Sequence, residues 1–141
     1  MERQSTNTLS RTMAEDLWAR WTAMWNGDTE LARAIIADGF YVHLQKKLAD
    51  PATIRDPEAV IGLVRTVRAQ YAEIRYETNL AVLVDGDTLI ARWFARGIFA
   101  GRSGRPEDVE GRTFRIAGID ILRIENGRIR ECWTVSNPTE E

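Results

Sequence analysis

The first quarter of the chain carries apolar residues at helical spacing. Five of them recur at intervals that place them on one face of a helix. They are Leu17, Trp18, Trp21, Met24 and Trp25. The segment Thr12-Met-Ala-Glu15 has the pattern of a capping box, and Asn26-Gly27 is typical of a helix end. The pattern therefore predicts a first helix that ends at residues 26–27.

Two further helices and a short strand follow in the predicted order. Asp28 can cap a short helix that closes at Asp38-Gly39, and residues 40–44 then form a strand. A loop runs through Pro51. Asp56-Pro57-Glu58 combines a capping carboxylate, a proline at the first helical position and an acid in the first turn, so a third helix begins there. The inward residues of these two helices are Leu31, Ile35 and Ile36, then Val60, Ile61, Val64 and Val67.

From Ile74 onward the apolar period changes to two, which is typical of strands. Two hairpins are predicted. The first joins strands at 78–84 and 88–99 through Asp85-Gly86-Asp87, and the second joins strands at 113–124 and 128–135 through Asn126-Gly127. Asn-Gly between alternating strands is the strongest short-range hairpin signal. The polar, glycine-containing segment 101–110 is predicted to be the loop between them.

Early helices followed by late strands indicate an α+β fold. Strands of about ten residues twist and curl, so we expect a curved antiparallel sheet that forms a cone, or half-barrel, covered by three N-terminal helices. Such a shape leaves an apolar cavity between sheet and helices. The expected boundaries are a flexible arm at 1–9, a single domain at 10–137 and a tail at 138–141.

Composition narrows the possible functions. The net charge of −2 gives no basic excess for nucleic acid, and no apolar run approaches the 18 residues of a membrane span. A single cysteine, Cys132, fits a reducing compartment, so we expect a cytoplasmic protein. One histidine and scattered acids offer no metal-ligand cluster, and no phosphate-binding glycine loop is present, so neither metal nor cofactor is expected.

Asp120 is the sharpest candidate for chemistry. Strand alternation groups it on one mostly apolar face with Ile116, Gly118, Leu122 and Ile124. A carboxylate enclosed there is costly to ionise, and its pKa rises toward the range useful for acid/base catalysis. The alternative is a buried structural Asp held by Arg or Trp side chains.

Several other polar residues could join Asp120. Tyr41 and His43 share one face of the first strand, and His43 is the only imidazole, so both are catalytic candidates beside a core or surface role. Arg92 and Arg96 flank Phe94 on one strand face and could hold a substrate oxyanion, or they could face solvent or a second subunit. Four tryptophans could line a pocket for a flat ligand, or simply fill the core. They are Trp18, Trp21, Trp25 and Trp133.

Residues 118–133, GIDILRIENGRIRECW, resemble the last hairpin of SnoaL-like proteins in the nuclear transport factor 2-like superfamily. The tryptophan-rich first helix and residues 55–60, RDPEAV, match too, so the resemblance runs from about residue 14 to 137. It implies a cone-shaped sheet with three helices, and Asp120 matches the acid/base residue of SnoaL-like cyclases. Many relatives have His at the position of Cys132 and Asp at that of Asn137, which we keep as a substrate-binding candidate.

This superfold hosts cyclases, isomerases, dehydratases, epoxide hydrolases and binding proteins, so fold alone does not name the activity. The first hypothesis is a cofactor-free isomerase, cyclase or lyase that acts on a small apolar, carbonyl-bearing molecule through Asp120. The alternatives are a non-catalytic binding protein for a small hydrophobic ligand and an epoxide hydrolase. Ala117, Ile119 and Ile121 form an apolar strip on the opposite face, so we also expect a homodimer through the outer sheet face.

Overall fold

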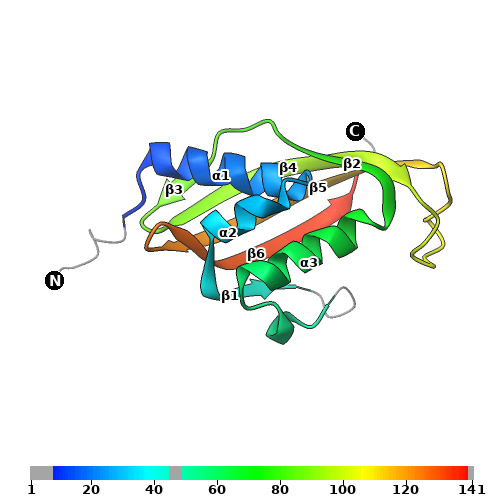
Figure 1. Ribbon diagram of the computed structural model, residues 1–141. Helices are drawn as coiled ribbons and strands as arrows, with labels where there is room; N and C mark the ends of the chain where they lie inside the picture. Colours follow the sequence, from blue (N-terminus) through cyan, green and yellow to red (C-terminus); the bar gives the residue numbers. More distant parts are fainter. Residues whose placement is uncertain (1–7, 45–48, 140–141) are drawn as a thin grey trace.

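Helices cover one face of a strongly curved sheet in the computed structural model, which describes residues 8–44 and 49–139 (Figure 1). The helical elements are α1 (Arg11–Trp25), η2 (Thr29–Leu31), α2 (Ala32–Ile35), η3 (Pro51–Thr53) and α3 (Pro57–Arg68). The strands are β1 (Ile36–His43), β2 (Tyr71–Thr78), β3 (Leu83–Asp85), β4 (Thr88–Phe99), β5 (Thr113–Glu125) and β6 (Arg128–Pro138). The predicted α+β class and the three helices over a curved sheet are confirmed.

The sheet runs in the order β1-β6-β5-β4-β2, with β3 beside the first half of β4. Four of its pairings are antiparallel, but β1 pairs with β6 in parallel. The expectation of a wholly antiparallel sheet is therefore wrong at this edge. The reason is topological: β1 and β6 lie far apart in sequence, so no hairpin dictates their relative direction.

Helix α1 begins two residues earlier than the predicted capping box implies. Ser10 is its N-cap, and its hydroxyl accepts a hydrogen bond from the Met13 amide, whereas Thr12 already lies inside the helix. The inward residues are those expected, with Trp25 half-buried. Ahead of the helix, Leu9 is buried in the core and its amide donates to the Gly86 carbonyl. Residues 1–7 of the predicted arm and residues 140–141 of the predicted tail lie outside the described residues.

Two element boundaries differ from the sequence prediction. The short helix ends at Ile35, because Ile36 already pairs with Ile129 of β6 and residues 36–39 continue as strand. The strand predicted at 78–84 is two strands instead: Tyr71–Thr78 pairs with the second half of β4, and Leu83–Asp85 pairs with its first half. The intervening residues carry the chain from one half of β4 to the other.

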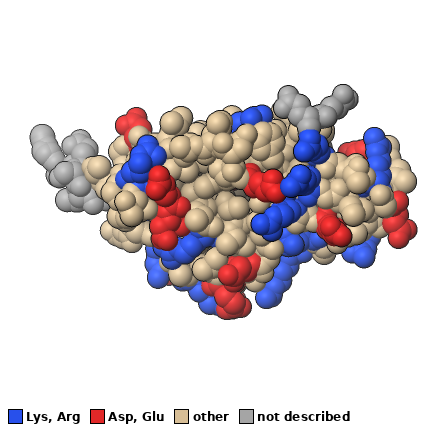
Figure 2. All heavy atoms as spheres, turned by 90° about the horizontal axis from the view of Figure 1, so that it is seen from above, with Lys and Arg blue, Asp and Glu red and all other residues tan. Residues whose placement is uncertain are grey.

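The second hairpin forms as predicted. Its turn has positive φ at both Asn126 and Gly127, as a type I′ turn requires. Along β5 the burial alternates, with Gly118, Asp120, Leu122 and Ile124 buried and the intervening residues more exposed. Charged side chains of both signs are interspersed over much of the face seen in Figure 2. Among the described residues, no helix is long and apolar enough to cross a membrane.

Candidate active site

Asp120 lies inside the molecule at the centre of the sheet, between Ala91 of β4 and Thr134 of β6. Its exposed fraction is 6%, so the predicted inward orientation is correct. Each carboxylate oxygen accepts one indole N–H. The Trp21 Nε1 donates to Oδ2 over 3.0 Å, and the Trp93 Nε1 donates to Oδ1 over 3.0 Å. The carboxylate is therefore held by one tryptophan from α1 and one from β4.

Burial raises the pKa of Asp120, because removal from water disfavours the charged form. Hydrogen bonds from the side chains of Thr134, Trp93 and Trp21 favour the carboxylate and oppose that rise. The net direction is upward. A carboxyl group in this condition can take up and release a proton closer to neutral pH than an exposed aspartate can.

Gly118 makes the contact between Trp93 and Asp120 possible. It is paired with Trp93 across β4 and β5, and the indole ring lies over the glycine. A Cβ atom at residue 118 would stand 2.2 Å from Cζ2 of Trp93 and 2.4 Å from Cε2, far inside van der Waals contact. Sequence reasoning placed Gly118 only on the inward face. A glycine in the interior of an apolar strand is the signal that marks such a close approach.

An aromatic wall surrounds the carboxylate. Trp21 contacts Trp25 edge-on with ring centroids 6.2 Å apart, Trp25 contacts Tyr76 at 5.7 Å, and Tyr76 contacts Trp93 edge-on at 5.4 Å. Tyr76 was not among the predicted site residues, although it shares its strand face with the buried Ile74. Burial raises the pKa of the Tyr76 phenol, and the charge of Asp120 adds to the rise.

Asn26 fixes the position of this wall. Its side-chain amide donates to the Tyr76 carbonyl over 3.0 Å, and its Oδ1 accepts from the Tyr76 amide over 2.7 Å. The residue that ends α1 therefore also attaches the helix to β2. This pair of bonds keeps Trp25, the last residue of α1, against the Tyr76 ring.

Trp21 and Trp93 lie directly against the Asp120 carboxylate, where the sequence predicts an apolar pocket. A hollow of about 380 Å³ opens beside them, between α1 and residues 78–82. Trp18 and Thr78 line it, and the Trp18 Nε1 donates to the Thr78 hydroxyl over 2.7 Å. Asp120 does not line this hollow. Thr78 pairs with Trp93 of β4, so Trp93 is the cross-strand neighbour of a residue that lines the hollow.

Tyr41, His43 and Trp133 lie on the outer face of the sheet, away from Asp120. In the second half of β1, Phe40 and Val42 are buried, which turns Tyr41 and His43 outward. His43 stacks on Trp133 with ring centroids 4.8 Å apart and meets Tyr41 edge-on at 4.9 Å. The expectation that these three share a pocket with Asp120 is wrong, because alternation along β1 and β6 sends them to the other side.

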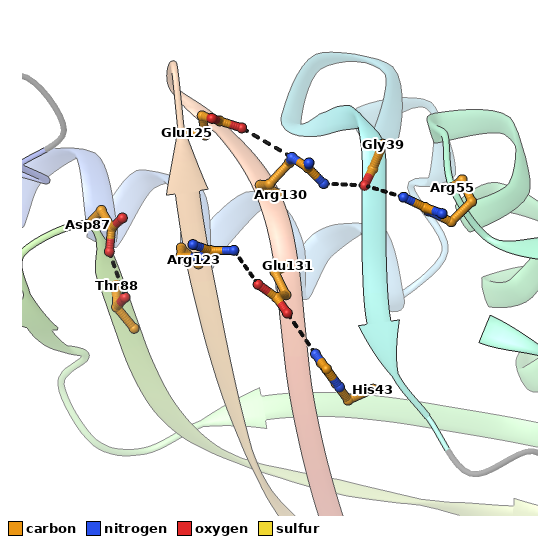
Figure 3. Close-up of polar contacts among 9 residues, drawn as sticks. All are labelled: Gly39, His43, Arg55, Asp87, Thr88, Arg123, Glu125, Arg130 and Glu131. Carbon is orange, nitrogen blue, oxygen red and sulfur yellow. Dashed lines mark hydrogen bonds and ion pairs between the residues drawn. The ribbon is translucent and has the colours of Figure 1, made fainter. Parts of the chain in front are cut away.

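The outer histidine belongs to a charged chain that Figure 3 shows. The Glu131 carboxylate bonds His43 Nε2 over 2.7 Å through one oxygen and accepts from Arg123 through the other over 2.5 Å. These contacts lower the pKa of Glu131, with the hydrogen bond from His43 the largest cause. Nearby, the Gly39 carbonyl accepts from Arg55 and Arg130 and anchors the strand edge.

The remaining predicted binding residues also lie on the outer face. In register, Arg92 stands opposite Ile119, and Phe94 stands opposite Ala117, which in turn faces Asn137. The Arg92 guanidinium lies over the Phe94 ring, 4.4 Å from its centroid. Arg96 is exposed and pairs with Glu77. The apolar residues of β4 that face inward are Leu89, Ala91, Trp93 and Ala95, so the arginine positions alternate away from Asp120.

Cys132 is buried on the inner face, in register with Leu122 of β5 and Val42 of β1. Burial and the charge of Asp120 raise the pKa of its thiol well above the usual value, so it is protonated at neutral pH. A protonated thiol in register with two aliphatic residues has a packing role. Among the described residues, no three His, Cys, Asp or Glu side chains gather as a possible metal site.

Comparisons with known proteins agree with this architecture. TsrD from Streptomyces laurentii is 22% identical, with a TM-score of 0.74 over 92% of this chain and 91% of that one. IdmH from Streptomyces antibioticus, a proposed polyketide cyclase, is 29% identical, with a TM-score of 0.70 over 87% and 91%. A SnoaL-like polyketide cyclase from Agrobacterium tumefaciens is 16% identical, with a TM-score of 0.68 over 87% and 90%.

No curated protein matches the chain. The family model of the SnoaL-like polyketide cyclases matches residues 10–140, which is nearly the full length. The chain therefore belongs to the SnoaL-like polyketide cyclase family.

Proposed function

We propose that the protein is a cofactor-free acid/base enzyme, of the isomerase, cyclase or lyase type, in which Asp120 moves the proton. The observation that carries the proposal is the position of Asp120: a single carboxyl group, 6% exposed, on an otherwise apolar sheet face. Its raised pKa suits proton transfer, and two indole N–H groups fix both of its oxygens. Family membership supports a small-molecule substrate.

The substrate is a small, flat, carbonyl-bearing molecule. Large apolar ring faces lie around or beside the carboxyl group. They belong to Trp18, Trp21, Trp25, Tyr76 and Trp93. Their N–H and O–H groups can hydrogen-bond a carbonyl oxygen while the rings stack on its plane.

Entry takes place from the hollow between α1 and residues 78–82. Trp18 lines this hollow, and Trp21 follows it one helical turn later on the same face of α1. A ligand in the hollow reaches Asp120 when the Trp93 ring swings away, which breaks one hydrogen bond to the carboxylate. That movement frees Oδ1 to act as the base.

The test is hydrogen–deuterium exchange at the carbon next to a ketone, with 2-tetralone as the probe and NMR as the readout. We expect the wild-type protein to accelerate exchange and Asp120→Asn to lose at least about 100-fold, the lower range for general acid/base catalysis. Asp38→Asn, on an exposed aspartate of β1, is the matched control and retains the wild-type rate. Equal exchange rates in wild type and Asp120→Asn would eliminate the mechanism.

A non-catalytic binding protein is the second candidate. The observation that favours it is that both oxygens of Asp120 already accept hydrogen bonds, which suits a fixed orienting group as well as a base. Saturable quenching of tryptophan fluorescence by 2-tetralone without any exchange would select this function. The epoxide-hydrolase alternative needs a second aspartate and a bridging arginine. Among the described residues, the side chains that hydrogen-bond Asp120 are two indoles and one hydroxyl, and none of them is an arginine.

We also propose a homodimer through the outer sheet face. Ile119 and Val135 lie in register there with exposed fractions of 43% and 67%, and Trp133 and Ile121 form the next pair. Contiguous exposed apolar side chains of this kind mark interfaces. Sedimentation at micromolar concentration should give a dimer, and Val135→Glu should give a monomer; a monomeric wild type would contradict the proposal.

A further inference from the structure

The inner face of β6 opens to water close to Asp120. Alternate residues of the strand share this face. Along it Cys132 is buried, Thr134 is half-buried and Ser136 is exposed. Thr134 is in register with Asp120, and Ser136 is in register with Gly118. Residues directly opposite on neighbouring strands point to the same face, so the Thr134 side chain lies between the carboxyl group and the exposed end of the strand.

The hydrogen-bond partners of Asp120 differ in what they can do with a proton. An indole N–H donates a hydrogen bond and cannot accept one, so Trp21 and Trp93 hold the carboxylate but cannot take its proton. A hydroxyl group both donates and accepts. Among the described residues that hydrogen-bond Asp120, Thr134 is therefore the one that can pass a proton in either direction.

Two further protic side chains lie near Asp120 and do not offer such a route. Burial is the main cause that raises the pKa of the Tyr76 phenol and of the Cys132 thiol, and the charge of Asp120 adds to both rises. Both groups therefore keep their protons at neutral pH. Within residues 8–44 and 49–139, neither of them hydrogen-bonds the Asp120 carboxylate. The Thr134 hydroxyl is left as the connection between this carboxyl group and water.

We propose that Thr134 is a proton-relay residue, which connects the buried Asp120 carboxyl group with solvent on the β6 side. After Asp120 has taken a proton from the carbon next to a carbonyl, its O–H donates that proton to the Thr134 oxygen while the Thr134 hydroxyl releases its own proton to water. The carboxylate and a neutral threonine are restored, and one proton has left for solvent. The reverse sequence brings a solvent proton to the carboxylate, which returns it to the enolate carbon.

The relay decides whether a proton is exchanged or retained. Asp120 lies between β4 and β6, so the Trp93 side and the Thr134 side of the carboxyl group are distinct. Without the hydroxyl, Asp120 still removes the substrate proton but holds it and returns the same proton. Isotope exchange then slows although the base is intact. This catalytic use of the relay rests on the proposed function, whereas the connection of Asp120 to water can be measured without a substrate.

The direct test is the carbon-13 NMR signal of the Asp120 carboxyl carbon, recorded at the pH where half of this group is protonated. Fast proton exchange averages the protonated and ionised forms into one narrow resonance. We expect a narrow resonance in the wild type and in Thr134→Ser, which keeps the hydroxyl. Thr134→Val keeps the side-chain shape and removes the hydroxyl, so proton exchange should slow at least about tenfold and the resonance should broaden or split.

The matched control is Thr113→Val, the same change at an exposed position of β5, which should give the wild-type resonance. Urea unfolding checks that each variant is folded. A narrow, averaged resonance in Thr134→Val, or a wild-type resonance just as broad, would overturn the proposal.

A second measurement follows exchange of 2-tetralone in deuterated water. Thr134→Val should slow it at least about tenfold and Thr134→Ser should restore it, while Asp120 still titrates in both variants. Wild-type exchange that persists unchanged in Thr134→Val would also contradict the relay. If the wild type does not exchange the ketone but the NMR difference is present, the proposed function fails and the relay stands.

Discussion

Gly118→Ala tests whether the Trp93–Asp120 contact organises the interior. The added methyl would stand 2.2 Å from Cζ2, 2.4 Å from Cε2 and 2.8 Å from Cη2 of Trp93. Carbon atoms pack at about 3.5 Å or more, so the ring must move by roughly 1.3 Å. The Nε1–Oδ1 distance is 3.0 Å, and a shift of this size takes it outside hydrogen-bonding range.

The expected loss of stability combines two effects. Overpacking an interior site costs about 1–3 kcal/mol, and the loss of a hydrogen bond to a charged group costs about 1.5–3 kcal/mol. The gain from replacing a strand glycine with alanine offsets about 0.5–1 kcal/mol of this. We expect a net loss of about 3 kcal/mol in the free energy of unfolding, measured by urea denaturation.

The control is Gly62→Ala in α3, where a Cβ atom would meet nothing within 4 Å. That change should stabilise the helix by about 0.5–1 kcal/mol. Trp93→Phe removes the outer ring of the indole, so the penalty of Gly118→Ala should shrink in that background. If Gly118→Ala unfolds at the wild-type urea concentration, or if its penalty is the same with Phe at position 93, the indole does not rest on the glycine and the reasoning fails.

Three further predictions concern the groups around this contact. Trp21→Phe removes one donor to Asp120, so the pKa of that carboxyl should rise further in a carbon-13 NMR titration, and the protein should lose about 1.5–3 kcal/mol at neutral pH. The pKa of Asp120 is raised in the folded state, so its contribution to stability is full below the unfolded pKa and is lost as the pH rises through the folded pKa. The free energy of urea unfolding should therefore fall over this pH range in the wild type and not in Asp120→Asn. The same pH dependence in both proteins would contradict the prediction. The pKa of Glu131 is lowered in the folded state, so its contribution to stability is present above the unfolded pKa and is lost as the pH falls through the folded pKa. In urea unfolding, Glu131→Gln should remove this loss of stability at acid pH, which is less than about 1 kcal/mol.

The second hairpin was predictable because its signals are local. Asn126-Gly127 fixes the turn, and strict alternation from Ile116 to Ile124 fixes which side faces inward. Both features depend only on neighbouring residues, so they needed no knowledge of the partner strands. The inward orientation of Asp120 followed from the same alternation.

The first half of the sheet was harder because its pairings are not local. Nothing in residues 71–78 alone indicates that they pair with the second half of β4, or that β1 runs parallel to β6. The face of β1 was nevertheless readable. Phe40 and Val42 share one parity, as Ala91 and Trp93 do on β4, and an apolar parity faces the core. Because His43 has the opposite parity to Phe40 and Val42, the same rule places its side chain on the outer face of the sheet.

The donor pattern around Asp120 also decides how its mutants must be interpreted. Each oxygen accepts from an indole N–H, so the amide of Asp120→Asn presents its own NH₂ to one of two donors. That variant therefore loses the titrating proton and also leaves one buried N–H without an acceptor, which costs about 1–3 kcal/mol. Trp93→Phe has no N–H at that position. In the double variant the stability penalty of the asparagine should fall while proton exchange stays abolished, and recovery of exchange in the double variant would show that geometry, rather than the proton, limits the reaction.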